Sequence, residues 1–157
     1  MFPKLSQYYK YAVVGLFVYM PFHIFFSQWL STFTGYLDVW KIGKDVFAWA
    51  ILIFGSALVI YAKKTNRLFW ILWGLLLAYT AIHGILFITT DQPIRTGVLA
   101  MIYNTRLMWF VLIGYNLSLL VKDKAKLAKQ FTKYLLVVST IVCVVALLQW
   151  ILPKDIM

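Results

Sequence analysis

Five long apolar segments constrain this chain more than any other feature. They run approximately over Tyr11–Leu30, Val46–Ala62, Leu68–Thr89, Gly97–Val121 and Thr132–Leu152. A helix needs about 20 residues to cross the hydrocarbon core of a bilayer, and spans of about 17–25 residues occur. The lengths therefore predict five transmembrane helices. The strands of a membrane β-barrel are shorter and alternate strictly in polarity, a pattern that we do not find.

The composition supports a membrane protein and excludes several other classes. Hydrophobic residues make up 63% of the 157 positions, charged residues 13%, and the mean hydropathy is +0.83. Soluble domains carry about a quarter charged residues. The sequence has no internal repeat and no low-complexity linker, so residues 1–157 are predicted to form one all-α, polytopic integral membrane unit without a soluble domain. The single cysteine, Cys143, excludes an intramolecular disulfide.

The basic residues are distributed unequally between the two predicted sides of the membrane. One side holds the ten residues Lys4, Lys10, Lys63, Lys64, Arg67, Lys122, Lys124, Lys126, Lys129 and Lys133; the other holds the four residues Lys41, Lys44, Arg95 and Lys154. Short basic loops stay in the cytoplasm. We therefore expect the N-terminus inside and the C-terminus outside. The lysines at 122–133 are interpreted as a topology signal and a contact with anionic lipids, not as a nucleic-acid site.

The first apolar segment has two interpretations, a cleaved signal peptide or a retained helix. No small-residue cleavage motif follows it, and bulky residues continue well beyond the usual length of a signal core, which favours the retained helix. Pro21 lies in the middle of this segment and cannot donate a hydrogen bond to the carbonyl of Phe17. We therefore predict a kink at Pro21.

The connection after the first span carries aromatic residues at helical spacing. Phe33, Tyr36, Leu37 and Trp40 follow the pattern i, i+3, i+4 and i+7. This spacing predicts a short helix that lies in the outer interface, where it could orient a lipid-linked substrate. A loop that carries ordinary interfacial aromatic residues is the alternative.

Four polar side chains from four different segments are predicted to lie at similar depth. Arg106 is sixteen residues from Lys122, which corresponds to about 24 Å at 1.5 Å per residue. The same count gives about 24 Å for His83 and Gln149 and about 20 Å for His23. These four residues therefore form a predicted polar layer in the outer half of the bilayer.

The polar layer can be read in two ways. In the structural reading, Arg106 reaches the outer headgroups and the other three residues are interhelical hydrogen-bonders. In the functional reading, they line an outward-facing cavity in which Arg106 binds a phosphate-bearing group and a histidine accepts a proton. Asn104 lies about 200° around the helix from Arg106, so the partner of Arg106 must be water, a headgroup, another helix or a ligand phosphate, whereas Tyr103 shares its face.

Several chemistries leave no motif in this sequence. It has no Gly-rich phosphate loop, no G-x-S-x-G and no H-E-x-x-H, and two isolated histidines do not make a metal site. The five acids, Asp38, Asp45, Asp91, Asp123 and Asp155, are all assigned to loops or to the chain end. We therefore predict no intramembrane carboxylate, which argues against a proton-driven transporter, and we expect no metal and no cofactor.

Three apolar stretches resemble a known family. "PFHIFFSQWL" in the first segment, "GVLAMIYNTRLMWFVLIGYNLS" after Asp91 and "VVALLQWILP" near the end are similar to the first, fourth and fifth spans of bacterial O-antigen ligase and O-antigen polymerase-type proteins. That resemblance implies a multi-pass protein of the inner (cytoplasmic) membrane, with about a dozen spans and the GT-C type of fold. Such proteins transfer undecaprenyl-diphosphate-linked glycan on the outer face, in lipopolysaccharide and other cell-envelope polysaccharide biosynthesis.

The resemblance also implies that this chain corresponds to the N-terminal portion of such an enzyme. The family's catalytic arginines and histidine lie in a large outer loop and later helices, so we expect this chain to be the N-terminal portion of a larger polytopic protein, with its catalytic residues unknown. Arg106 matches a family-like position and is, with Arg95, a candidate for diphosphate binding. The alternatives are a small non-enzymatic membrane subunit of a transport or assembly complex and a fragment of a lipid or anion transporter. Continuation of the reading frame past Met157 would favour the glycosyltransferase.

Overall fold

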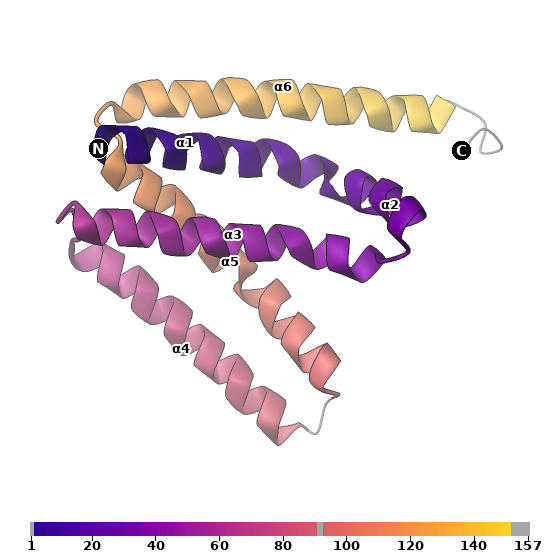
Figure 1. Ribbon diagram of the computed structural model, residues 1–157, viewed down its shortest axis with the longest axis horizontal. Coiled ribbons are helices and arrows are strands. Elements are labelled where there is room, and N and C mark those ends of the chain that lie inside the picture. Colours follow the sequence, from indigo (N-terminus) through magenta and orange to yellow (C-terminus); the bar gives the residue numbers. More distant parts are fainter. Residues whose placement is uncertain (1, 91–92, 152–157) are drawn as a thin grey trace.

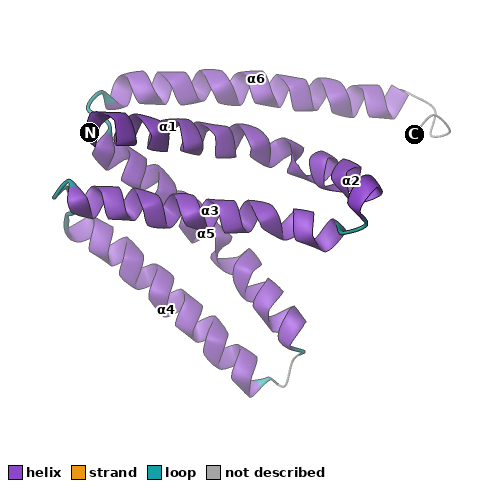
Figure 2. Cartoon of the chain, in the orientation of Figure 1, coloured by secondary structure: helices purple, strands orange, loops and turns teal. Residues whose placement is uncertain are grey.

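The protein is a bundle of membrane-length helices joined by short connections. The computed structural model describes residues 2–90 and 93–151, and every regular element within these ranges is a helix (Figure 2). The elements are α1 (Phe2–Tyr19), η1 (Met20–Phe22), α2 (His23–Thr34), α3 (Leu37–Tyr61), α4 (Arg67–Thr89), α5 (Ile94–Leu120) and α6 (Lys124–Ile151).

Among the described residues, five helical segments are long and apolar enough to cross a membrane, as predicted. They are Lys4–Thr34, Val39–Tyr61, Arg67–Thr89, Thr96–Leu120 and Lys124–Leu147. Three helices begin well before the start that the sequence predicts. Helix α1 begins at Phe2 and not at Tyr11, and α6 begins at Lys124 and not at Thr132, so the lysines at 124–129 belong to the helix and not to a loop.

The third case is the start of the second span. Val46 was the expected start because Lys41, Lys44 and Asp45 precede it, but α3 begins at Leu37 and carries all three charges within the helix.

The predicted kink at Pro21 is confirmed. The α-helix stops at Tyr19, a single 3₁₀ turn covers Met20–Phe22, and α-helix resumes at His23. Proline lacks the N–H that would continue the ladder, so the backbone tightens locally instead of breaking. As a result, α2 continues from α1 in a changed direction (Figure 1).

The predicted interfacial helix between the first two spans is wrong. Gly35 adopts the left-handed conformation, with φ 74°, and its N–H donates to the carbonyl of Ser31 at 2.8 Å, which ends α2 at Thr34. Phe33 therefore belongs to α2, whereas Leu37 and Trp40 belong to α3. Because the glycine turn separates them, these residues do not share one helical face, and the indole N–H of Trp40 instead donates to Thr34 Oγ1 across the turn at 2.8 Å.

The basic residues of three chain segments gather at one end of the bundle, which we call the basic end. Figure 1 places the N-terminus, the α3–α4 connection and the α5–α6 connection at this end. The α2–α3 turn, the end of α4 and the start of α5 lie at the opposite end. The segments that the sequence assigns to the cytoplasmic side therefore lie together in space, and we propose that the basic end faces the cytoplasm.

Cysteine labelling tests this orientation. In a background with Cys143→Ala, cysteines introduced at Ser31 and Thr96 are expected to react with a membrane-impermeant maleimide in intact cells. A cysteine at Thr65, in the α3–α4 connection, is expected to react only after permeabilisation, because the positive charges around it hold that loop inside. Reaction of the Thr65 cysteine in intact cells would show that the proposed orientation is wrong and that the basic end lies outside.

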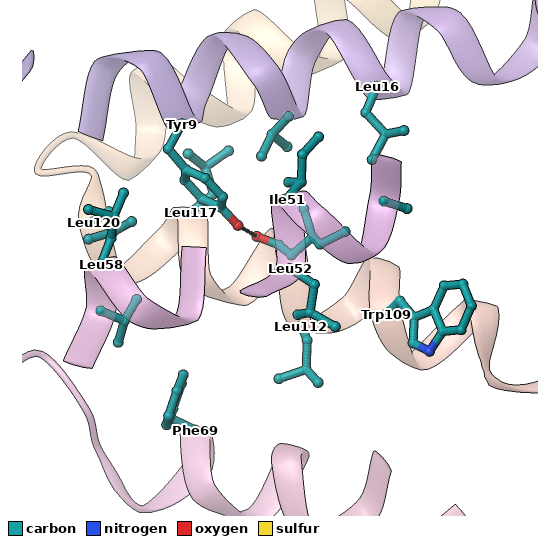
Figure 3. Packing of buried hydrophobic residues seen from close by; sticks show 14 of the residues in the cluster. Tyr9, Leu16, Ile51, Leu52, Leu58, Phe69, Trp109, Leu112, Leu117 and Leu120 are labelled. Carbon is teal, nitrogen blue, oxygen red and sulfur yellow. Dashed lines mark hydrogen bonds between the residues drawn. The ribbon is translucent and has the colours of Figure 1, made fainter. Parts of the chain in front are cut away.

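The packed core lies where α1, α3 and α5 meet. Tyr9, Val13 and Leu16 of α1 are fully buried against residues of α3 and α5 such as Leu52 and Ile113 (Figure 3). By contrast, α4 buries Phe69 and Leu76, and in the part of α6 whose side chains are described only Val138 is buried. The core therefore fixes α3 against α5, whereas α4 and α6 lie at the edges of the bundle.

Candidate functional site

An ion pair between two helices is the central polar feature of the structure. Arg106 of α5 donates from Nη2 to Asp45 Oδ2 of α3 at 2.9 Å. The Asp45 side chain is 6% exposed and that of Arg106 is 23% exposed. Of the four kinds of partner that the sequence allowed for Arg106, the structure thus shows a neighbouring helix.

The prediction that all five acids lie in loops or at the chain end is wrong for Asp38, which belongs to the first turn of α3, and for Asp45. Asp45 lies inside α3, within the Val39–Tyr61 span, and is buried. A buried carboxylate is costly unless a cation with good hydrogen-bond geometry accompanies it, and Arg106 is that cation. Hydropathy alone places Asp45 before the second span. Its partner Arg106 lies sixty-one positions further along the chain, and the sequence does not show that the two residues meet.

Two further cationic groups and an aromatic ring surround the ion pair. Lys44 Nζ is 3.9 Å from Asp45 Oδ2 and donates to the carbonyl oxygen of Lys41 at 3.1 Å. The Tyr103 ring lies 4.7 Å from the guanidinium carbon of Arg106, a cation–π contact between residues that the sequence placed on one face. Among the side chains that the structure describes here, Lys41, Lys44 and Arg106 carry three positive charges against the one negative charge of Asp45. We call these residues, with Tyr103, the Arg106 cluster, and the excess positive charge of its described members attracts anions.

The Arg106 cluster contains polar atoms that the described residues leave unpaired. Asp45 Oδ1 and Arg106 Nε are both buried and have no hydrogen-bond partner among the residues that the structure describes. Buried polar atoms are normally satisfied, by protein or by water. Asp45 occupies one amino nitrogen of the guanidinium, so the cluster retains hydrogen-bonding capacity for a further polar group.

The register between α3 and α5 is fixed by contacts that continue from the ion pair toward the basic end. One helical turn away, the Trp49 and Trp109 rings lie 4.9 Å apart. Further along, Asn116 Nδ2 donates to Ser56 Oγ at 2.9 Å, and the Tyr9 hydroxyl donates to the carbonyl of Ile113 at 3.1 Å (Figure 3). The Trp49–Trp109 and Ser56–Asn116 contacts hold Arg106 opposite Asp45, since a shift of α3 along α5 would break both. The Tyr9 hydrogen bond joins α1 to α5 in the same region.

A groove of about 680 Å³ opens beside the Arg106 cluster, between α3 and α5. Its residues are mostly apolar, and the polar ones are the Lys41 and Tyr103 of the cluster. The complete lining is Lys41, Ile42, Ile94, Val98, Leu99, Ile102 and Tyr103. The groove therefore combines a long apolar wall with one cationic side chain, Lys41, which suits a ligand with an apolar chain and an anionic group.

The two histidines of the predicted polar layer interact within their own helical segments. His23 Nδ1 donates to the carbonyl of Met20 at 2.7 Å, and the His83 ring meets the Tyr79 ring edge-on at 4.7 Å. Neither histidine lines the groove beside the Arg106 cluster. The contacts of the described residues do not join them to Arg106, so their part in one shared cavity stays a prediction.

Two predicted site residues lie outside the described side chains. Arg95 belongs to the first turn of α5 and Gln149 to the last turns of α6. The positions of their side chains are not described. Their predicted roles in diphosphate binding and in the polar layer are therefore still predictions.

Asp45 could have been found from the sequence by the depth count that selected Arg106. It is eighteen residues from Lys63, which corresponds to about 27 Å, close to the 24 Å counted for Arg106. An acid and a base at similar depth on two predicted spans form a candidate pair. Lys44 has no comparable signal, because its proximity to Asp45 depends on the rotamers of both side chains.

Comparison of the chain with protein-family profiles, with characterised proteins and with solved structures finds no match.

Proposed function

We propose that this chain is the N-terminal membrane portion of a glycosyltransferase of the O-antigen ligase or polymerase type, and that the α3–α5 groove holds its undecaprenyl-diphosphate-linked glycan. The observation that carries the proposal is that two members of the Arg106 cluster, Lys41 and Tyr103, line an apolar groove, and that the Tyr103 ring contacts the Arg106 guanidinium. A lipid-linked diphosphate has the two matching parts, an apolar isoprenoid chain and an anionic headgroup.

The charges of the cluster suit a diphosphate better than a neutral lipid. Lys41 lines the groove, Lys44 lies one helical turn from it, and Arg106 retains donors that Asp45 does not use. A guanidinium presents its donors in a planar fork that matches phosphate oxygens. Because the site is partly enclosed by apolar side chains, each such interaction is stronger than it would be in water.

Asp45 has a positioning role in this proposal. It accepts a hydrogen bond from one end of the Arg106 guanidinium and so fixes the plane of the fork. It also balances part of the positive charge that the helix pair would otherwise bury without a ligand. The proposal assigns carrier binding to this chain and leaves glycan transfer to residues that the family carries in its later helices.

Carrier binding can be measured on the purified chain. In phosphatidylcholine nanodiscs, undecaprenyl diphosphate is expected to raise the temperature of thermal unfolding, because a ligand that binds only the folded state stabilises it. Undecaprenol, which lacks the anionic group, is expected to have no comparable effect. Arg106→Lys is expected to weaken the diphosphate affinity by about tenfold or more, since lysine offers a point charge without a fork.

Controls for this experiment separate specific binding from general attraction to anions. Lys63→Gln removes one positive charge at the basic end, far from the groove, and should leave the affinity unchanged. Phosphatidylglycerol should not compete with undecaprenyl diphosphate at equal concentration. If Arg106→Lys and Arg106→Gln both bind the diphosphate as the unchanged chain does, Arg106 is only an anchor between helices and the proposed site is wrong.

A second candidate function is that of a non-enzymatic membrane subunit. The observation that favours it is the exposed apolar surface of α4, in which Trp70, Leu77 and Ile85 are more than half exposed. Such a surface can contact lipid or the helices of another membrane protein. Purification in a mild detergent distinguishes a subunit from a carrier-binding protein. A subunit should co-purify with one partner in fixed stoichiometry, and the Arg106→Gln variant should retain that partner.

A further inference from the structure

Three lysines share one face of α6 at the basic end. Lys126, Lys129 and Lys133 are separated by three and four residues, so they lie on one side of the helix, and each is exposed. With 3.6 residues per turn, the three lie within about 60° of one another. The basic residues of this segment are thus part of a helix that continues directly into the fifth span.

The opposite face of α6 attaches the helix to the bundle. Leu127 and Phe131 pack against the core, and the Phe131 ring meets the Phe17 ring of α1 edge-on at 5.6 Å. Counted around the helix, the three lysines lie about 140–160° from Phe131. The lysine face is therefore directed away from α1 and toward the surrounding bilayer.

The lysine face has no counter-charge within the described part of the chain. The carboxylate nearest in sequence, Asp123, accepts a hydrogen bond from the backbone N–H of Lys126 at 2.9 Å, and no described acidic side chain forms an ion pair with any of the three lysines. Lys126, in the first turn of α6, also lies at the positive end of the helix dipole, which is unfavourable for a cation. An anion from outside the chain would offset both effects.

We infer that the lysine face of α6 binds the headgroups of anionic phospholipids in the leaflet at the basic end. The face runs over eight residues, about 10 Å along the helix from Lys126 to Lys133, and lysine side chains extend their ammonium groups along such a helix into the headgroup region. Attraction of lysines to anionic lipid is strong near the surface and decays within a Debye length. This inference is independent of the proposed carrier site, which lies toward the other end of the bundle.

Spin-labelled lipids test this inference directly. The purified chain is reconstituted in dioleoylphosphatidylcholine vesicles that contain trace spin-labelled phosphatidylglycerol or spin-labelled phosphatidylcholine, and the motionally restricted fraction of each is measured by electron paramagnetic resonance. We expect phosphatidylglycerol to associate at least about twofold more strongly, and we expect 0.5 M NaCl to reduce the difference by screening. Equal association of the two lipids at low salt would overturn the inference.

Two triple variants locate the effect. Changing Lys126, Lys129 and Lys133 to Gln should abolish most of the preference, and changing the same three to Arg should retain it. The matched control changes Lys4, Lys63 and Arg67 to Gln, which removes the same charge from exposed positions at the same end. Equal loss of preference in the two Gln variants would show that only net charge matters and would refute a lysine-face site. Circular dichroism of each variant verifies that its helix content is unchanged.

Discussion

Replacing Asp45 by asparagine is expected to lower the thermal stability of the bundle strongly, because it leaves the Arg106 guanidinium and the Lys44 ammonium without their shared carboxylate. Loss of one partner from a buried ion pair costs about 3–5 kcal/mol, and we expect about 3 kcal/mol because Arg106 remains 23% exposed. Thermal unfolding in detergent, followed by tryptophan fluorescence, measures the effect.

Substitutions of Asp45 and of Arg106 should lower the free energy of unfolding by different amounts. Arg106→Gln is expected to cost less stability than Asp45→Asn, because Lys44 remains 3.9 Å from the carboxylate and can partly replace the guanidinium. The double variant should be less destabilised than the sum of the two single variants, as for residues in direct contact. Equal and additive losses would show that the contact between Asp45 and Arg106 contributes no stability.

Asp123→Asn is the matched control for the Asp45 substitution. It makes the same chemical change at an exposed carboxylate that accepts a backbone N–H at the start of α6. Asparagine is about as good as aspartate in such a capping position, so we expect a change of well under about 1 kcal/mol. A loss as large as that of Asp45→Asn would point to a general effect of negative charge.

Adding one methyl group at Gly55 is expected to destabilise the core. A Cβ at this position of α3 would overlap the tip of the Tyr9 ring, which is fully buried and donates to the Ile113 carbonyl. Overpacking of a filled core typically costs about 1–3 kcal/mol, and displacement of Tyr9 would also break its hydrogen bond. We therefore expect Gly55→Ala to lower the unfolding temperature of the purified chain.

The opposite result is expected at a glycine in open surroundings. A Cβ at Gly74 of α4 would meet no atom within 4 Å, and alanine is the better helix former by about 1 kcal/mol. Gly74→Ala should therefore leave the unfolding temperature unchanged or raise it. Tyr9→Leu combined with Gly55→Ala should recover part of the loss, because leucine lacks the ring tip. If Gly55→Ala is as stable as Gly74→Ala, the close approach of α1 and α3 is wrong.

The sequence was sufficient to predict five membrane-length helices and the break at Pro21, but not where each helix begins. Hydropathy over about 20 residues identifies a membrane helix, because no backbone amide can be left unpaired in hydrocarbon. Proline removes a donor wherever it occurs, so the 3₁₀ turn at Pro21 followed from one residue. The shared face of Tyr103 and Arg106 is likewise local, since three residues nearly complete a helical turn.

The prediction of an interfacial helix was wrong because of Gly35, whose effect on the backbone is not visible in the spacing of the apolar residues. The spacing of Phe33, Leu37 and Trp40 fits one helix, but Gly35 between them adopts φ 74° and separates two helices. A glycine favours this conformation without requiring it. Whether it ends a helix depends on what the following segment packs against, and here α3 continues into the core beside α5.

The candidate site was decided by the tertiary structure. Arg106 is a candidate from the sequence because a charge inside an apolar segment is costly. Asp45 is not, because hydropathy places it before the second span, although it lies inside α3. Their pairing, like that of Ser56 with Asn116 or of Gly55 with Tyr9, joins residues that are far apart in the chain. Helical periodicity defines the faces of each span, but only the packing of the helices determines which faces meet and in which register.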